Sequence, residues 1–165
     1  MSWSTYIIIL VIAAVIGKIY FAKKQTELLE AGVIEERDNI AVRQEHTFYS
    51  KRIKNPLDII EKMDKSFFKG VNALGLPGNI TITEGKDNTY IFTYKDMVNT
   101  AYFGLFTQQA QEEFRYSLTV IEASNLEGIS LIFNIILTSM ERAIKNLDPD
   151  VEVERTVQDF VKSKN

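Results

Sequence analysis

The feature that most constrains this chain is a long apolar run near its N-terminus. Residues 6–17 read YIIILVIAAVIG, and after Lys18 the run resumes and continues through Ala22. From Trp3 to Ala22 an α-helix rises about 30 Å, which equals the thickness of the hydrocarbon core of a bilayer. The run therefore predicts a single membrane-spanning helix, with residues 6–22 in contact with the lipid bilayer.

The residues that flank the run support this prediction. Aromatic side chains are enriched at membrane interfaces, and here they stand at both ends as Trp3, Tyr6, Tyr20 and Phe21. Lys18 lies one turn inside the far end, where its long side chain can extend to the lipid headgroups. Two alternatives fit less well. A cleaved signal peptide needs a basic start and a small-residue cleavage site, and a buried core helix does not need flanking aromatics.

The distribution of lysines around the run predicts its orientation. Residues 1–5 contain no Lys or Arg, whereas Lys18, Lys23 and Lys24 lie at the other end. Basic residues close to a membrane helix stay on the cytosolic side. The expected topology has a short tail outside and residues 23–165 in the cytosol.

The rest of the composition excludes several classes of protein. The 165 residues include 19 basic and 22 acidic side chains, so the net charge of -3 gives no bulk positive field to attract nucleic acid. Cysteine is absent, which excludes disulfides, thiolate metal sites and a cysteine nucleophile. A hydrophobic content of 45% with 25% charged residues is ordinary for a globular domain.

We expect three segments along the chain. Residues 1–22 form the N-terminal tail and the transmembrane helix, residues 23–54 form a polar juxtamembrane stalk, and residues 55–165 form a compact domain. His46 is the only histidine and belongs to the stalk. Its charged surroundings in the sequence predict a solvated surface residue.

Local patterns predict most elements of the compact domain. Residues 55–74 begin with Asn-Pro, a strong helix start, and continue with apolar residues at helical spacing. Two alternating segments within residues 80–94, joined by a short polar loop, predict a β-hairpin. Residues 114–120 also alternate and predict a further strand.

The remaining segments favour helices. Residues 96–113 fit either a strand or a helix, and their Gln-rich stretch without turn residues favours the helix. A long helix is expected from Ser124 to about Leu147, and its apolar stretch 129–137 makes it the most buried element without being long enough for a second membrane span. Residues 153–161 predict a last amphipathic helix.

These elements together predict an α+β domain. Its antiparallel sheet has three to four strands, and its helices pack on one face of that sheet. The opposite face carries hydroxyl side chains, which are Thr81, Thr83, Thr89, Thr93, Ser117 and Thr119.

No pattern of residues predicts catalysis. A single histidine forms neither a histidine-rich metal site nor, in the absence of a Gly-x-Ser-x-Gly motif, a recognisable catalytic triad. The acidic pairs at 35–36, 112–113 and 148/150 suit helix surfaces and caps, and no glycine-rich phosphate-binding motif occurs. We therefore identify no catalytic, cofactor-binding or metal-ligating residue and expect neither a cofactor nor an enzyme.

The anchor and the compact domain without a catalytic motif favour one function. We expect a membrane-anchored protein whose domain binds a protein partner, as a subunit of a larger membrane-associated assembly. One alternative is a domain that binds a small ligand or lipid in a cavity lined by the aromatic residues of 90–106. Another is a component of a secretion or translocation machine, which would place the domain outside the cytosol.

Overall fold

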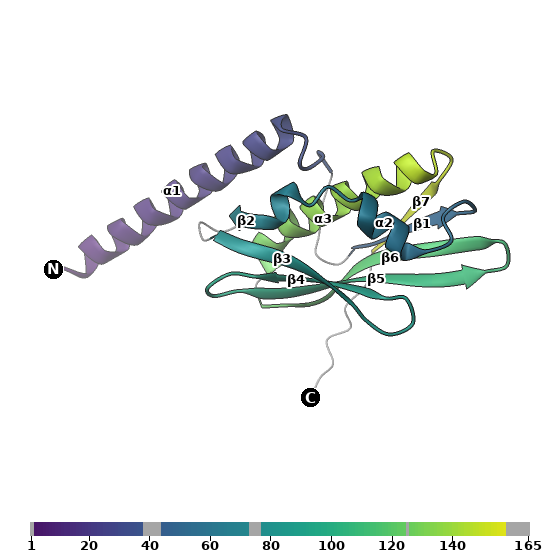
Figure 1. Cartoon of the computed structure of the whole chain (residues 1–165). Helices are drawn as coiled ribbons and strands as arrows, with labels where there is room; N and C mark the ends of the chain where they lie inside the picture. The colour runs from purple at the N-terminus through teal and green to yellow at the C-terminus, as the bar shows by residue number, and fades with distance from the viewer. Residues whose placement is uncertain (1, 38–43, 73–76, 125, 158–165) are drawn as a thin grey trace.

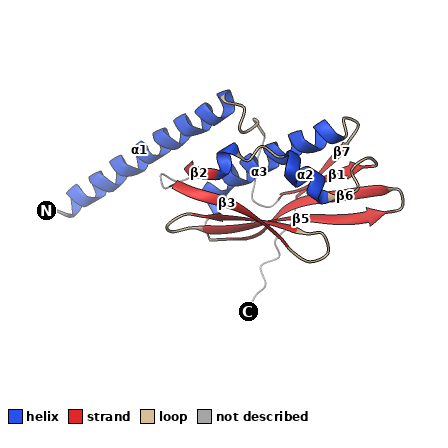
Figure 2. Cartoon of the chain, viewed as in Figure 1, coloured by secondary structure: helices blue, strands red, loops and turns tan. Residues whose placement is uncertain are grey.

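The computed structural model describes residues 2–37, 44–72, 77–124 and 126–157. Within them the fold is α+β: one long N-terminal helix precedes an antiparallel sheet with helices packed on it (Figures 1 and 2). The predicted class is confirmed, but the expected sheet of three to four strands is wrong, since the sheet has seven strands.

The elements follow one another along the chain with these bounds. The helices are α1 (Trp3–Glu30), α2 (Pro56–Lys62), the 3-10 helix η1 (Ser66–Phe68) and α3 (Leu126–Leu147). The strands are β1 (Gln44–Ser50), β2 (Lys69–Asn72), β3 (Pro77–Glu84), β4 (Tyr90–Lys95), β5 (Thr100–Ala110), β6 (Glu113–Ala123) and β7 (Glu152–Val157).

The strands lie in the order β2-β3-β4-β5-β6-β1-β7. The run from β2 to β6 is a meander in which each strand pairs with the next along the chain. The last two positions are different, because β1 pairs antiparallel with β6 and β7 then pairs with β1. One edge of the sheet is therefore built from distant parts of the sequence.

The core lies between the sheet and its helices. Alternate residues of the central strands point to the helical side and are buried there; they include Phe48, Phe92, Phe103, Leu105, Tyr116 and Leu118. On α3, residues 129–141 are buried apart from the half-buried Ser130, because the sheet lies on one side and α2 with residues 33–37 on the other. The prediction that this helix is the most buried element is confirmed.

The β3–β4 hairpin forms as predicted. Its five-residue loop closes through hydrogen bonds from Thr89 N to Lys86 O (3.1 Å) and from Gly85 N to Thr89 O (2.7 Å). Asp87 and Asn88 have positive φ angles of 54° and 56°. Both residue types tolerate this conformation, and it gives the turn the twist that joins two antiparallel strands.

The helix favoured for residues 96–113 is wrong, because β5 occupies 100–110. This strand pairs with β4 on one side and with β6 on the other. The buried side chains Ala101, Phe103 and Leu105 alternate with the exposed Tyr102 and Phe106 and with Gly104, which has no side chain. Pairing on both sides outweighs the helix propensity of the Gln-rich segment, which is a weak bias of a few tenths of a kcal/mol per residue.

The helix expected over residues 55–74 is much shorter. Asn55 caps α2 as predicted, accepting a hydrogen bond from Leu57 N (3.0 Å), but the helix ends at Lys62. Met63 is extended (φ −62°, ψ 136°). Asp64 then accepts a hydrogen bond from Ser66 N (2.9 Å), which starts η1 and leads into β2. Leu74, the expected last apolar residue of the stripe, lies outside the described residues.

The last amphipathic helix expected over 153–161 is also wrong in its described part. Residues 152–157 form β7, and Val153 lies opposite the buried Phe48 of β1. The spacing of the valines fits the period of a helix as well as that of a strand. A strand forms because residues 152–157 pair with the free edge of β1. Residues 158–161 lie outside the described residues.

Candidate membrane anchor and its junction with the domain

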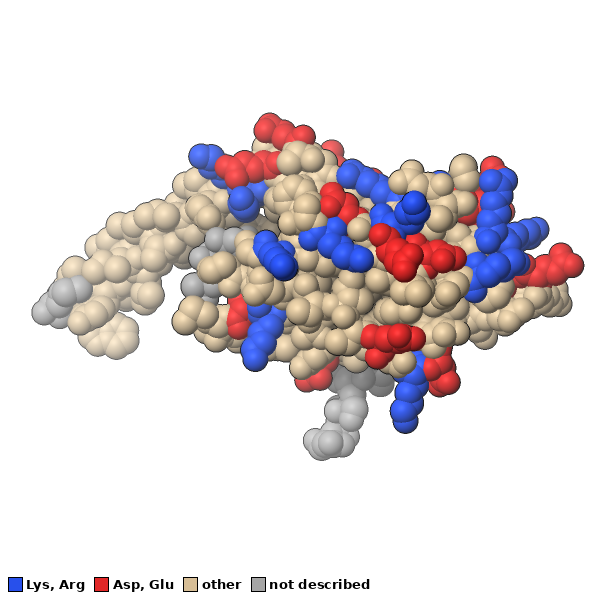
Figure 3. All heavy atoms as spheres, viewed as in Figure 1, with Lys and Arg blue, Asp and Glu red and all other residues tan. Residues whose placement is uncertain are grey.

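The first fifteen residues of α1, from Trp3 to Gly17, carry no charged side chain. The helix has 28 residues and none of them is buried. Among the described residues it is the one helix long and apolar enough to cross a membrane. The visible side of its N-terminal two thirds carries no charged side chain, whereas charged groups gather near its C-terminal end (Figure 3).

The C-terminal end of α1 is docked on the domain. Phe21, Leu28 and Leu29 are partly buried against the hydrophobic core. The helix ends at Glu30, and Gly32, two residues later, has a φ of +67°. Gly32 N donates to Leu29 O (2.9 Å) and Val33 N donates to Leu28 O (2.8 Å), which is the hydrogen-bond pattern of a Schellman motif.

The chain that follows α1 is buried rather than solvated. Val33 and Ile34 belong to the core. Residues 44–50, which we expected in a polar stalk, form β1 inside the sheet. The compact unit therefore includes most of the described part of residues 23–54. Its sequence is rich in charged residues, but β1 and the core residues Val33 and Ile34 lie among them.

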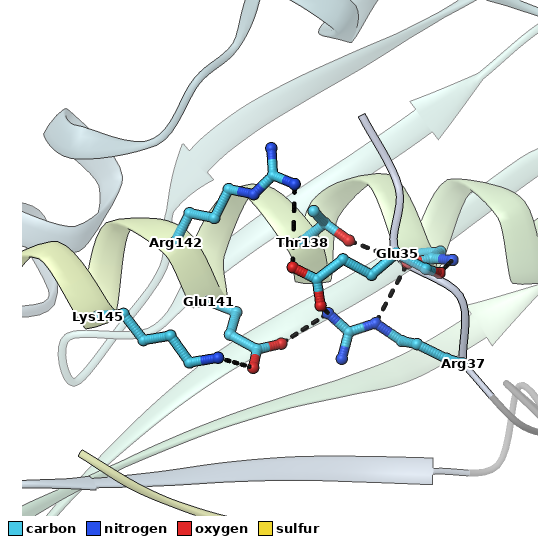
Figure 4. Close-up of polar contacts among 7 residues, drawn as sticks. Glu35, Arg37, Thr138, Glu141, Arg142 and Lys145 are labelled. Carbon is cyan, nitrogen blue, oxygen red and sulfur yellow. Dashed lines mark hydrogen bonds and ion pairs between the residues drawn. The ribbon is translucent and has the colours of Figure 1, made fainter. Parts of the chain in front are cut away.

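A buried ion pair holds residues 35–37 on α3 (Figure 4). The Arg37 guanidinium donates to Glu141 Oε2 at 2.6 Å, and the two side chains are only 3% and 7% exposed. Lys145 Nζ lies 2.7 Å from the other Glu141 oxygen. Burial by itself raises the pKa of Glu141, but the hydrogen bonds from Lys145 and Arg37 outweigh it and hold that pKa below its ordinary value.

Neutral side chains of α3 complete this network. Asn134 Oδ1 accepts from Arg37 Nε (3.3 Å) and from Thr138 Oγ1 (3.0 Å), and Asn134 Nδ2 donates to Glu35 O (2.9 Å). The Glu35 carboxylate accepts from Arg37 (3.1 Å) and lies 3.9 Å from Arg142. Satisfied polar networks of this kind specify one arrangement of the groups they join. The exit from α1 is thus fixed to the central helix.

His46 is buried, so the prediction of a solvated surface residue is wrong. Its side chain is 1% exposed, neither ring nitrogen has a hydrogen-bond partner, and the ring packs 5.8 Å from that of Phe133. Burial, followed by the nearby charges of Arg155 and Arg37, lowers its pKa to about 4. The sequence signal for this burial is the spacing of His46, Phe48 and Ser50 at every second position, which places all three on the core side of a strand.

The face of the sheet opposite the helices carries hydroxyl groups, as predicted, together with an apolar patch. Thr47 and Ser117 are hydrogen-bonded there (2.9 Å). The ring of Phe106 lies over Gly104, where an added Cβ would overlap it, and Ile121 borders the same space. We call Tyr102, Phe106 and Ile121 the open-face patch, since all three are exposed.

The aromatic residues expected to line one cavity lie on two sides of the sheet. Tyr90, Phe92, Tyr94 and Phe103 are part of the close-packed core, whereas Tyr102 and Phe106 belong to the open-face patch. Of these residues, Tyr90 lines a pocket of about 400 Å³ with Ile60 and Phe68, and a further pocket of about 210 Å³ lies between Gly32, Lys62 and Arg142. In the described part of the chain no group of three His, Cys, Asp or Glu residues could hold a metal ion.

The chain was compared with family models, curated proteins and solved structures. No family model, curated protein or solved structure matches it. Its function is therefore inferred from its own residues.

Breaking the buried ion pair should destabilise the domain. We expect Arg37→Ala to lower the free energy of unfolding by about 3 kcal/mol, because it removes the buried one of the two cations that pair with Glu141 and leaves only the exposed Lys145. The matched control is Lys24→Ala, which removes an exposed pair with Glu27 and should cost less than about 1 kcal/mol. Urea unfolding of the full chain in mild detergent, followed by circular dichroism, measures both. Equal losses would contradict a special role for the Arg37–Glu141 pair.

Burial of His46 predicts a loss of stability in mild acid. The unfolded chain takes up a proton near pH 6.5, whereas the folded chain resists it down to about pH 4. The free energy of unfolding should therefore fall by about 2 kcal/mol between pH 7 and pH 5. In His46→Phe this fall should largely disappear, since the carboxylates titrate below that window. An unchanged pH profile in His46→Phe would show that another group is responsible.

Proposed function

We propose that this chain is a single-pass membrane protein whose domain, held in the cytosol, binds a protein partner within a larger assembly. The observation that carries the proposal is the exposed apolar surface of α1, whose C-terminal end packs against a folded domain.

Lipid is the environment that suits α1 best. Each exposed Val, Ile or Leu side chain in water loses roughly 1.5–3 kcal/mol relative to an apolar environment. The exposed large apolar residues of α1 run from Trp3 to Tyr20 around the whole helix. A bilayer covers such a surface on every side, whereas packing on one protein face would leave the rest in water.

The orientation rests on lysines at one end of the span. Lys18, Lys23 and Lys24 lie on the side of the domain, and the preceding tail contains no basic residue. This asymmetry favours a cytosolic domain.

The open-face patch supports a protein partner. Tyr102 and Phe106 of β5 and Ile121 of β6 are exposed together, on the side of the sheet away from α2 and α3. Aromatic residues are enriched at the centre of protein interfaces, and the rim of such interfaces is polar. The surrounding threonines and Ser117 supply donors and acceptors for a polar rim.

The anchor is tested by charge substitutions within α1. Ala13→Arg places a charge at the centre of the span, at a cost of about 2.5–3.5 kcal/mol, and should shift the protein into the carbonate-soluble fraction. Lys18→Leu should leave it in the membrane fraction, because that lysine serves only to reach the headgroups. If Ala13→Arg stayed fully resistant to carbonate, the proposed span would be wrong.

The partner surface is tested by a matched pair of substitutions. Phe106→Glu puts a charge in the open-face patch. The control, Leu57→Glu, puts a charge outside the patch, at a leucine of α2 that is about as exposed as Phe106. In affinity purification of the full chain from mild detergent, co-purifying protein should be lost roughly tenfold with Phe106→Glu, since burying an unpaired charge in an interface costs more than 1.4 kcal/mol. It should be retained with Leu57→Glu. Equal recovery with both variants would exclude the patch as the binding surface.

A further inference from the structure

The turn between β4 and β5 presents two apolar side chains to solvent. Met97 is 83% exposed and Val98 is 72% exposed, and outside α1 they are the most exposed large hydrophobic residues in the described part of the chain. Isolated exposed hydrophobic residues are common on protein surfaces.

A buried network holds this turn in one conformation. Asp96 Oδ1 accepts hydrogen bonds from Val98 N (2.8 Å) and Asn99 N (2.6 Å), and Asp96 Oδ2 accepts from Tyr94 Oη (2.8 Å). Asp96 and Asn99 are themselves buried, and Tyr94 is fully buried in the core. The two apolar side chains are therefore displayed on a rigid support, and little conformational entropy is lost when they are covered.

The turn lies at the end of the domain from which the membrane helix projects. Thr100, just after the turn, is hydrogen-bonded to Ser124 next to the start of α3. Figure 1 shows the N-terminal part of α1 extending beyond this same end of the sheet and of α3. The strand ends that carry Met97 and Val98 thus point in the direction of the proposed span.

The junction brings the domain to the level of the membrane surface. Phe21 belongs to the proposed span of residues 6–22, yet it also packs against the hydrophobic core of the domain. After Ala22, α1 continues for only eight residues to Glu30, about 12 Å of helix, before the chain turns back. The domain therefore lies against the headgroup region instead of standing away from it.

The charges beside the turn suit a lipid surface. Lys95 precedes the turn and pairs across the sheet with Asn79, which in turn lies opposite Lys69. Both lysines are exposed. Lysines next to exposed apolar residues combine attraction to anionic headgroups with insertion into the upper acyl region.

We propose that the Met97–Val98 turn inserts into the same bilayer as α1 and forms a second contact between the domain and the membrane. This inference rests on the proposed membrane span. With two points of attachment, the helix axis and one end of the sheet, the domain has a defined orientation on the membrane, and the open-face patch is held at a fixed angle to the surface.

The absence of cysteine allows a direct test with single-cysteine variants of the full chain. Val98→Cys, Asp87→Cys and Ile12→Cys are each labelled with an environment-sensitive fluorophore and reconstituted into phosphatidylcholine–phosphatidylglycerol vesicles. One set of vesicles carries a spin-label quencher high on the acyl chain, which reports on residues 98 and 87, and a second set carries it near the end of the chain, at the depth expected for Ile12. Asp87 is the control, because it lies in the β3–β4 turn at the opposite end of these strands.

The label at residue 98 should lose fluorescence by roughly twofold, as expected for a group 5–10 Å into the interface, and the label at residue 87 should not. Equal quenching at residues 98 and 87 would overturn the second contact. The same result is expected if residue 98 is covered by protein instead of lipid. Ile12 separates the two proposals: quenching at 12 without quenching at 98 rejects only the second contact, and no quenching at 12 rejects the span itself.

Discussion

The burial of α3 on both of its sides is the constraint on which the rest of this structure depends. The sheet covers one side with large aromatic and aliphatic residues such as Phe103 and Leu118. The other side would remain exposed without α2 and the segment that follows α1. The polar groups Asn134 and Glu141 of α3 require partners on that covered side, and Arg37 with Glu35 supplies them, whereas the Thr138 hydroxyl donates to Asn134 within the helix. One core helix therefore determines both the layering of the domain and the path of the chain out of α1.

The parts of the fold that depend on local sequence were predictable. The β3–β4 hairpin has its own turn residues, β6 alternates from Phe114 to Val120, and the helix after Ser124 has a long apolar stretch. The errors concern elements defined by distant partners. Residues 100–110 and 152–157 have patterns compatible with two periods, and only the neighbouring strands select between them. The strand at 44–50 was missed because it lies among charged residues and pairs with residues about seventy positions away.

The candidate site also has one part that was predictable from the sequence and one that was not. The apolar run was evident from composition, because a span is a property of consecutive residues. The junction was not, since Arg37 and Glu141 are separated by 104 positions and each is an ordinary charged residue in its local context. Likewise, no local signal distinguishes the exposed Met97 and Val98 from the buried Met63 and Val71. Exposure is a property of the finished fold.

The position of β1 in the sheet has a consequence for the order in which the protein folds. During synthesis β1 emerges directly after α1, but its neighbours β6 and β7 are made only after most of the domain. The meander from β2 to β6 can form progressively from contacts that are close in sequence, whereas β1 has to wait for a loop of more than sixty residues to close. Until then β1 remains an unpaired strand on the nascent chain, a state in which a chaperone would encounter it.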